Sequence, residues 1–551
     1  MARPVAPVVR PCFVAFAFLG FAACTTDTSQ APGDICQQAA EVIEHCGGVA
    51  PDAPVEGCVG SLSDSAEHVV DVGCDALDGA DGKTDAFWCS AGTRWLGLCD
   101  IVPLETAAEI ADLDSVCPAS RTDELCAALR DGDDELARAA VRSSVEAGPR
   151  ARVVGDKAVQ YWIRERTAAL LVWNVALSLE ADPSAPEFVD GVMSELFPAY
   201  DPESFEMAHR PLAPSTPGCD GPVEAAILFF PGVVRLGNRD EFTEQGRAVE
   251  DALPCVRAYT VDTGSFVEPS VNAQQGRIAF ELATEELGSV PVHLVGYSQG
   301  STNALTTLVD VPHVADLASS VLVMNSAAHG SEVADTLGGI ITELDGTFCE
   351  SVAEFARPAC EWADQRSPLP NDLLMETIAF AMGLPVEALA EFIAAEDSIA
   401  AAPTVQAFFG AHTPGVQSLS TEVAARFWRE RADALPNDTL YYSFRSVISD
   451  PTENLPLSNR LFFSLLERAG ESVPYNDMQV RLENQRLGGA IADMEVVGPV
   501  AEGNHWQWEL ATGAVPESVM PAEMTSKIPH REFMVAYFQT LTEAGLLLAG
   551  K

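Results

Sequence analysis

A serine between two glycines is the feature of this chain best suited to chemistry. Gly296, Ser298 and Gly300 form the pattern G-x-S-x-G, which a short apolar run (292–295) precedes and a helix-compatible run (301–308) follows. A serine on a sharp strand-to-helix turn exposes its hydroxyl, and the N–H groups of the following helix can stabilise an oxyanion. The pentapeptide alone also occurs as an ordinary turn in glycine-rich chains. With its flanking runs it predicts a nucleophile at Ser298.

A serine nucleophile needs a histidine base, which a carboxylate in turn orients. Where such a serine follows a strand of a parallel sheet, the acid and then the histidine come after the serine along the chain. The histidines beyond Ser298 and before the C-terminal helix are His313, His329, His412 and His505. Because His505 alone leaves room for an acid-bearing strand before it, we expect His505 to be the base. The alternative is a histidine packed against the neighbouring Trp506 and Trp508.

Two aspartates are candidates for the acid that orients the base. Asp450 closely follows the apolar run 441–448, which is a standard position for such an acid. Asp477 lies 28 residues before His505. Spacing alone leaves both aspartates open.

The part of the chain from about Cys219 alternates between strand-like and helical patterns. Strand-like runs that alternate with helical stretches predict an α/β fold, a mostly parallel sheet with helices on both faces. Cys219 and Cys255 stand before two consecutive runs, which favours a disulfide between them. The predicted strands are Ala225–Phe230, Cys255–Val261, Val292–Val295, Ser320–Met324, Leu440–Ile448 and Met494–Val500.

A long, mostly helical stretch without a strand pattern interrupts this alternation at about 331–435. We expect it to be an insertion over the carboxyl edge of the sheet, where sites of this architecture open. Cys349 and Cys360 are expected to link within it. Its helical apolar spacing fits helices that pack on the core, and it also fits a lid whose apolar face opens at a lipid surface.

The residues beyond the nucleophile carry further patterns. The run VLVMNSAAHGSEVADTL (321–337) resembles the Pro-His-x-Gly-Ser-x-x-Ala-Asp segment of true bacterial lipases, without the proline and one residue tighter. Residues 476–480 and 504–506 are similar to the Asn-Asp-Gly-x-Val acid loop and the Asn-His-x base loop of that family, with Met478 in place of glycine. The resemblance implies an α/β-hydrolase fold with a helical lid, and it favours Asp477 over Asp450 as the acid.

An oxyanion hole needs backbone donors where negative charge develops. One donor is expected from the N–H of Gln299, directly after the nucleophile. The other is expected from the N–H of Val233, because Pro231 and Gly232 stand where the resembling family has a His-Gly pair. That family often holds calcium beside the histidine loop through an aspartate two residues past the histidine. Gln507 occupies that place, so neither a metal nor another cofactor is expected.

The composition restricts the class of partner. The chain has 551 residues, 47% of them hydrophobic, and a net charge of −49. Such a length and hydrophobic content predict globular domains, and the strongly acidic surface repels nucleic acid. We therefore expect no nucleic-acid partner.

The N-terminus has the pattern of an export signal. Arg3 and Arg10 precede an apolar stretch that is too short to span a membrane, and Cys24 follows it. Residues 1–23 resemble a bacterial lipoprotein signal peptide, which implies lipidation of Cys24 and attachment to the cell envelope, with the outer membrane or cell surface favoured. Ordinary cleavage after Ala23, which would give a secreted protein, is the alternative.

The mature chain then divides into a tether (24–34), a cysteine-rich, mainly helical module (35–145), a helical connector (146–217) and the α/β-hydrolase domain (218–551). Even numbers of cysteine in an exported protein indicate disulfides, although eight cysteines leave the pairing open. The missing C-x-x-C pairs argue against zinc. The eight are Cys36, Cys46, Cys58, Cys74, Cys89, Cys99, Cys117 and Cys126.

These features together predict an exported serine hydrolase. We expect a lipase or esterase that cleaves carboxylic esters through a Ser-His-Asp triad and an acyl-enzyme. The enzymatic alternative is an acyltransferase or a polyester depolymerase on the same fold. The non-enzymatic alternative is a surface lipoprotein with an inactive hydrolase domain.

Overall fold

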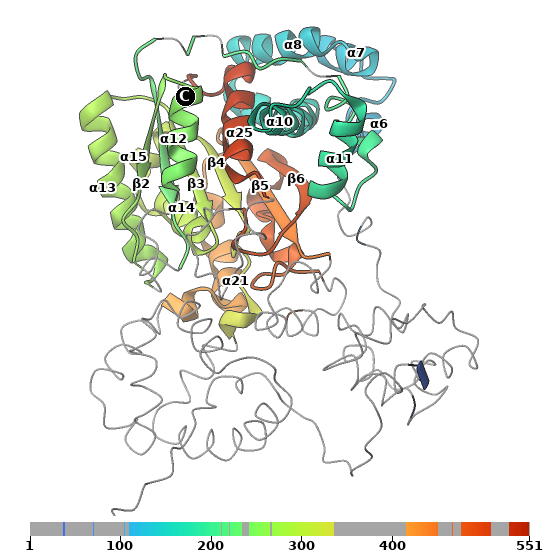
Figure 1. The fold of residues 1–551 in the computed structure, drawn as a ribbon. Helices are drawn as coiled ribbons and strands as arrows, with labels where there is room; N and C mark the ends of the chain where they lie inside the picture. The colour runs from blue at the N-terminus through green and yellow to red at the C-terminus, as the bar shows by residue number, and fades with distance from the viewer. Residues whose placement is uncertain are drawn as a thin grey trace, which may run out of the picture.

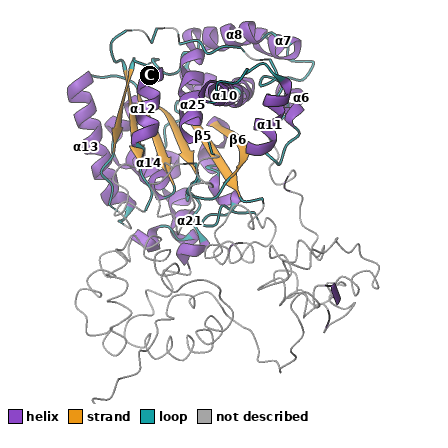
Figure 2. Cartoon of the chain, viewed as in Figure 1, coloured by secondary structure: helices purple, strands orange, loops and turns teal. Residues whose placement is uncertain are grey.

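The structure is a computed structural model, shown in Figures 1 and 2. The structure describes residues 110–210, 212–216, 218–219, 221–233, 242–264, 267–335, 415–449, 475–508 and 528–549, together with positions 37, 38, 70, 104 and 466. Within these ranges the chain forms a parallel sheet and the helices that cover it.

Six parallel strands form the described sheet, in the order β2-β1-β3-β4-β5-β6. Each strand predicted from an apolar run is present, and the observed bounds differ from the expected ones by at most two residues. The strands are β1 (Ala225–Phe230), β2 (Val256–Thr260), β3 (Val292–Tyr297), β4 (Ala318–Met324), β5 (Leu440–Val447) and β6 (Glu495–Glu502). Because all strands run the same way, their carboxyl ends share one edge of the sheet.

Both faces of the sheet are buried, since successive side chains of a strand point to opposite faces. In β1, Ile227 and Phe229 belong to one hydrophobic cluster, and Leu228 and Phe230 belong to another. This is why the strands read as continuous apolar runs in the sequence.

Helices cover the two faces, so the strands form a central layer (Figure 2). The first face packs on α10 (Lys157–Ser178), α12 (Thr243–Ala252) and α25 (His530–Ala544). The second face packs on α13 (Pro269–Leu287), α14 (Gln299–Asp310) and α15 (Pro312–Leu317).

The described part of the cysteine-rich module is helical. A disulfide between Cys117 and Cys126 joins α6 (Leu113–Val116) to α7 (Glu124–Asp131), and α8 (Asp134–Ala147) follows. An acidic run (131–135) lies where α7 ends and α8 begins. There the side chain of Asp133 accepts a hydrogen bond from the Leu136 N–H and caps α8.

The residues between this module and β1 pack directly on the sheet. After α9 (Arg150–Val154) comes the long helix α10, and then α11 (Pro186–Leu196) and η3 (Pro202–Ser204). Helix α10 lies beside α25, the last helix of the chain (Figure 1). The segment expected to be a connector therefore contributes to the same core as the strands.

A buried ion pair joins α10 to α25. Arg166 Nε lies 2.7 Å from Glu543 Oε2, and both side chains are almost fully buried. The same guanidinium donates to the carbonyl of Leu212, and Glu543 Oε1 accepts a hydrogen bond from the Ser215 N–H. The pair thus fixes two helices and the segment that leads to β1.

The predicted disulfide between Cys219 and Cys255 is present, just before β1 and β2. None of the described helices combines the length and the apolar character that a membrane span requires.

His293 lies in β3 and is fully buried. Its Nε2 is 2.9 Å from the carbonyl oxygen of Leu547, which can only accept, so Nε2 carries the proton. Its Nδ1 then accepts from the hydroxyl of Ser320, at 2.8 Å. Burial lowers the pKa of His293 from 6.5 to about 4, so the imidazole is neutral in the folded protein at neutral pH.

This burial predicts an acid-sensitive fold. Between pH 6.5 and about 4 the unfolded chain binds a proton at His293 that the folded chain does not. Stability therefore falls as the pH is lowered through this window, by about 3 kcal/mol from this residue. The free energy of unfolding measured in urea across pH 4–7 checks this. His293→Gln should give a shallower pH dependence, and an unchanged slope would contradict the assignment.

Candidate active site

Ser298 stands between β3 and α14 in a strained conformation, with φ 53° and ψ −123°. Its N–H donates to the carbonyl of Met324 at 3.0 Å. Glycines make the turn possible, because a Cβ at Gly300 would lie 1.8 Å from the carbonyl oxygen of Phe230. A Cβ at Gly296 would lie 2.5 Å from Cα of Ser301. The sequence therefore forms the sharp, strained strand-to-helix turn that nucleophilic serines occupy.

Asp477 lies in a tight loop beyond β5 and is fully buried. The loop is fixed to the end of β5, because the N–H of Ile448 donates to the carbonyl of Asn476 at 3.0 Å. Oδ1 of Asp477 accepts from the N–H groups of Gln479 (3.0 Å) and Val480 (2.7 Å). These bonds hold one carboxylate oxygen and leave Oδ2 for other partners.

His505 follows β6 and meets this free oxygen. Its Nδ1 lies 2.7 Å from Asp477 Oδ2, and both side chains are almost fully buried. The backbone N–H of His505 also donates to the carbonyl of Asp477 at 2.7 Å. Because the carboxylate accepts, Nδ1 carries the proton and Nε2 keeps its lone pair. The structure thus brings the predicted base and the favoured acid together.

Nε2 of His505 is buried and has no hydrogen-bond partner among the residues that the structure describes. Tyr297, the residue before the serine, contacts this histidine: the two ring centroids are 5.2 Å apart, and the Tyr297 hydroxyl donates to the His505 carbonyl at 2.7 Å. The hydroxyl of Ser298 therefore does not form a hydrogen bond to His505 Nε2 in this structure. Nucleophile and base often stand at looser distances before a substrate binds.

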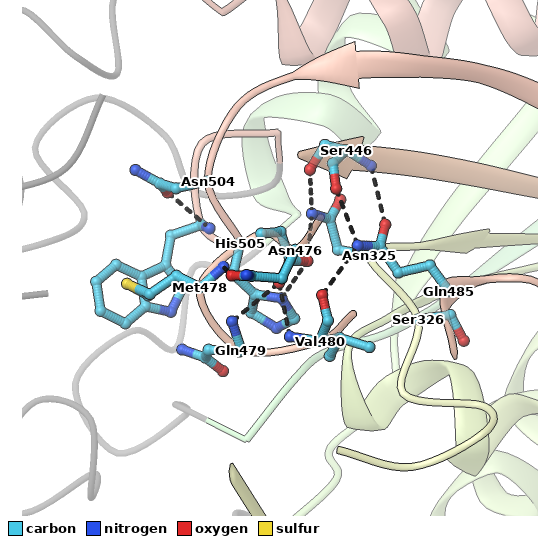
Figure 3. Close-up of polar contacts among 12 residues, drawn as sticks. Asn325, Ser326, Ser446, Asn476, Met478, Gln479, Val480, Gln485, Asn504 and His505 are labelled. Carbon is cyan, nitrogen blue, oxygen red and sulfur yellow. Dashed lines mark hydrogen bonds and ion pairs between the residues drawn. The ribbon is translucent and has the colours of Figure 1, made fainter. Parts of the chain in front are cut away.

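Behind Asp477 lies a polar network that sequence reasoning missed (Figure 3). Asn325, directly after β4, donates through Nδ2 to Asp477 Oδ2 at 2.9 Å and to the hydroxyl of Ser446 in β5 at 2.5 Å. Gln485 in η7 (Leu482–Gln485) binds both backbone groups of Ser446 and donates to the carbonyl of Val480. The available signal was the position of Asn325 at the carboxyl end of a predicted strand.

The residues expected to form the oxyanion hole lie beside the nucleophile. The N–H of Gln299 is the first of α14, so it has no acceptor within the helix. Gly232 lies against Ser298, because a Cβ at that glycine would be 3.3 Å from the serine Cβ. Val233 follows Gly232 in this loop and is partly buried. The side chain of Gln299 is engaged elsewhere, since its Nε2 donates to the carbonyl of Val267 at 3.0 Å.

The two ends of the expected insertion meet beside the acid loop. The carboxylate of Asp335 accepts from the N–H and the hydroxyl of Thr421, at the start of α21 (Thr421–Glu430). Ser331 donates to the carbonyl of Gln479 at 2.6 Å, and Glu332 pairs with Arg481 at 3.0 Å. The stems of the insertion are thus attached to the loop that carries Asp477.

The two other candidate histidines that the structure describes, His329 and His313, do not join the Asp477–His505 pair. His329 stacks on Trp428 with ring centroids 4.9 Å apart, its Nε2 donates to the carbonyl of Leu487, and burial lowers its pKa. His313 is exposed. The remaining expected residues fall outside the described part of the chain: His412, Asp450, Cys24, Cys349 and Cys360, with most of the insertion.

No described cluster of three or more His, Cys, Asp or Glu side chains has the arrangement to hold a metal ion. Gln507 stands where the resembling family has its calcium-binding aspartate. Its Oε1 accepts from the N–H of Asn504 at 2.7 Å, so this side chain closes the histidine loop on itself.

The strand order and the chain order of the site define the fold. The serine follows β3, the acid lies beyond β5 and the histidine follows β6, all at the carboxyl edge of a parallel sheet with helices on both faces. This is the α/β-hydrolase fold, as the sequence predicts.

Comparisons with known proteins gave no family model and no curated protein that matches the chain. Solved structures similar to it include a metagenomic carboxyl esterase, with 18% identity, a TM-score of 0.38 and coverage of 60% of this chain and 77% of that one. A Bacillus licheniformis lipase in its mature form has 16% identity, a TM-score of 0.32 and coverage of 52% and 86%. These values are low, and the fold assignment rests on the strand order and the site.

Met478 occupies the position where the resembling acid loop has glycine. Its φ is 87°, a left-handed conformation that disfavours side chains, and its side chain is buried. Asn476 Oδ1 accepts from the N–H of Met478 at 2.8 Å and holds this turn.

The strain at Met478 can be measured with two truncations. Met478→Ala and Met478→Gly both remove the buried side chain, but glycine alone adopts a positive φ without cost. We expect the glycine variant to be about 1 kcal/mol more stable than the alanine variant, measured by urea unfolding. Equal stabilities would show that this backbone carries no strain.

Proposed function

We propose that this protein is a serine hydrolase that cleaves carboxylic esters through an acyl-enzyme. The observation that carries the proposal is the buried 2.7 Å hydrogen bond between His505 Nδ1 and Asp477 Oδ2, at the edge of the sheet where Ser298 stands in its strained turn. A buried Asp–His pair leaves Nε2 as an oriented base, which a serine nucleophile requires.

In the proposed reaction Ser298 Oγ attacks the ester carbonyl carbon while Nε2 of His505 takes the hydroxyl proton. Asp477 stabilises the imidazolium and keeps its orientation. The N–H groups of Gln299 and Val233 donate to the oxyanion of the tetrahedral intermediate. His505 then returns the proton to the leaving alcohol, and water releases the acid from Ser298 by the same steps.

Esters with apolar acyl groups are the proposed substrates. An apolar cluster lies among the loop of Val233, the insertion stems and the acid loop, and it contains Val233, Ala327, Ala334, Leu419 and Val480. The N–H of Ala327 faces the carbonyl of Ser298 at 3.5 Å, so the cluster adjoins the nucleophile. These side chains are largely buried, and we propose that the acyl chain packs against this cluster, which favours apolar acyl groups over charged ones.

Hydrolysis of p-nitrophenyl esters of increasing chain length tests the proposal. The wild type should turn over at least one ester, and Ser298→Ala should abolish this activity. Asp477→Asn should lower kcat by about 10⁴-fold, because the histidine loses its orienting carboxylate.

The matched control is Asp450→Asn, which should keep wild-type kcat. A loss confined to that variant would transfer the role of acid to Asp450. If no ester of any length is turned over in a Ser298-dependent way, the function proposed here is wrong.

We also propose that the protein is exported and anchored to the cell envelope through lipidated Cys24. The disulfides Cys117–Cys126 and Cys219–Cys255 support an oxidising compartment. Metabolic labelling with an alkyne fatty acid should mark the wild type and not Cys24→Ser. Labelling of both to the same extent would exclude this anchor.

A further inference from the structure

Asn325 is the first residue beyond β4 and is fully buried at the carboxyl edge of the sheet. Its backbone is left-handed, with φ 44°, and its N–H donates to the carbonyl of Phe444 in β5 at 3.2 Å. This backbone extends the pairing of β4 with β5 by one residue. It places the amide side chain beside the loop of Asn476 and Val480 (Figure 3), within hydrogen-bond distance of Asp477.

The orientation of this amide follows from its partners. One partner is the carboxylate of Asp477, whose ionised oxygens accept hydrogen bonds and donate none. The atom of Asn325 that lies 2.9 Å from Asp477 Oδ2 must therefore be Nδ2, which lies 2.5 Å from the hydroxyl oxygen of Ser446 as well. The reversed amide would set Oδ1 against a negative charge.

The hydrogen bonds of Asp477 divide between its two oxygens. The backbone N–H groups of Gln479 and Val480 reach Oδ1. The side chains of His505 and Asn325 reach Oδ2. Asn325 thus donates to the same oxygen that receives the histidine proton, and it comes from a different strand.

Stability alone does not account for this residue. Its Oδ1 is buried without a hydrogen-bond partner in the described part of the chain, and its φ lies where most side chains are disfavoured. Both features cost free energy. Such costs are typical of functional positions, and the compensating contact is the bond to the acid.

We propose that Asn325 is a positioning residue for the reaction proposed above: it holds Asp477 Oδ2 in place and stabilises the carboxylate, so that His505 stays oriented toward Ser298. The inference rests on the proposed function. Asn325 touches neither the substrate nor the reacting atoms, and it acts through Asp477.

Two measurements on the full-length protein test this inference. The first compares kcat and KM for the best p-nitrophenyl ester. Asn325→Ala should lower kcat by about 10- to 100-fold, the value of a hydrogen bond to a charged group, and leave KM within about twofold. In the Asp477→Asn background the same substitution should lower kcat no further, because residues that act as a unit are not additive.

Ser446→Ala and Asn325→Gly are the matched controls. The first removes the other acceptor of the amide and leaves its bond to Asp477, so most of kcat should remain. The second relieves the left-handed backbone and should lose as much kcat as Asn325→Ala, which assigns the effect to the side chain. A kcat for Asn325→Ala within twofold of wild type overturns the inference, as does an equal loss in the Asp477→Asn background.

The second measurement is independent of turnover. The proton between His505 Nδ1 and Asp477 should give a downfield ¹H NMR line that His505→Gln removes. Asn325→Ala should shift or broaden this line, and Ser446→Ala should leave it. If the wild type hydrolyses no ester, the proposed function fails. The line still decides whether Asn325 orders the pair, and an unchanged line in Asn325→Ala excludes that role.

Discussion

The close approach of helix α14 to the end of strand β1 is the constraint on which the site depends. A glycine at position 300 permits it, because any side chain there would collide with the carbonyl oxygen of Phe230. The helix can then begin directly at the sheet edge, and Ser298 is held in its strained turn between the two elements. The same contact sets the first N–H of α14 beside the loop of Gly232, so the proposed nucleophile and the proposed oxyanion donors are positioned by one close approach.

The remaining parts of the site come from strands that are neighbours in the sheet. β4 leads to Asn325, the end of β5 anchors the acid loop, and β6 leads to His505. Parallel pairing brings the ends of these strands to one edge, where their loops bind one another. Most of these contacts are buried, so the low dielectric strengthens the polar bonds and makes an unpaired group costly. The Asp–His pair is therefore held by the register of the sheet.

The sequence was sufficient to predict the strands, the Cys219–Cys255 disulfide and the position of His505, because each depends on a local run or on chain order. Chain order left Asp450 and Asp477 both open, and the resemblance of residues 476–480 to the lipase acid loop favoured Asp477, which the structure pairs with His505. Asn325 could not be found in this way, since its partners lie in β5 and in the acid loop, and register alone brings them together. The substitution of Met478 for glycine is visible in the sequence, but its positive φ is not. The partner of α10 could not be predicted either, because this helix packs on α25 at the other end of the chain.

The pairing of α10 with α25 has a consequence for how the chain folds. Arg166 and Glu543, which hold the two helices together, are 377 residues apart. Contacts between residues so distant in sequence require closure of a very long loop, and they slow folding. One face of the sheet stays partly uncovered until the last helix has been synthesised. During synthesis this apolar face is exposed to other chains, so the folding yield depends on how quickly the C-terminal helix arrives.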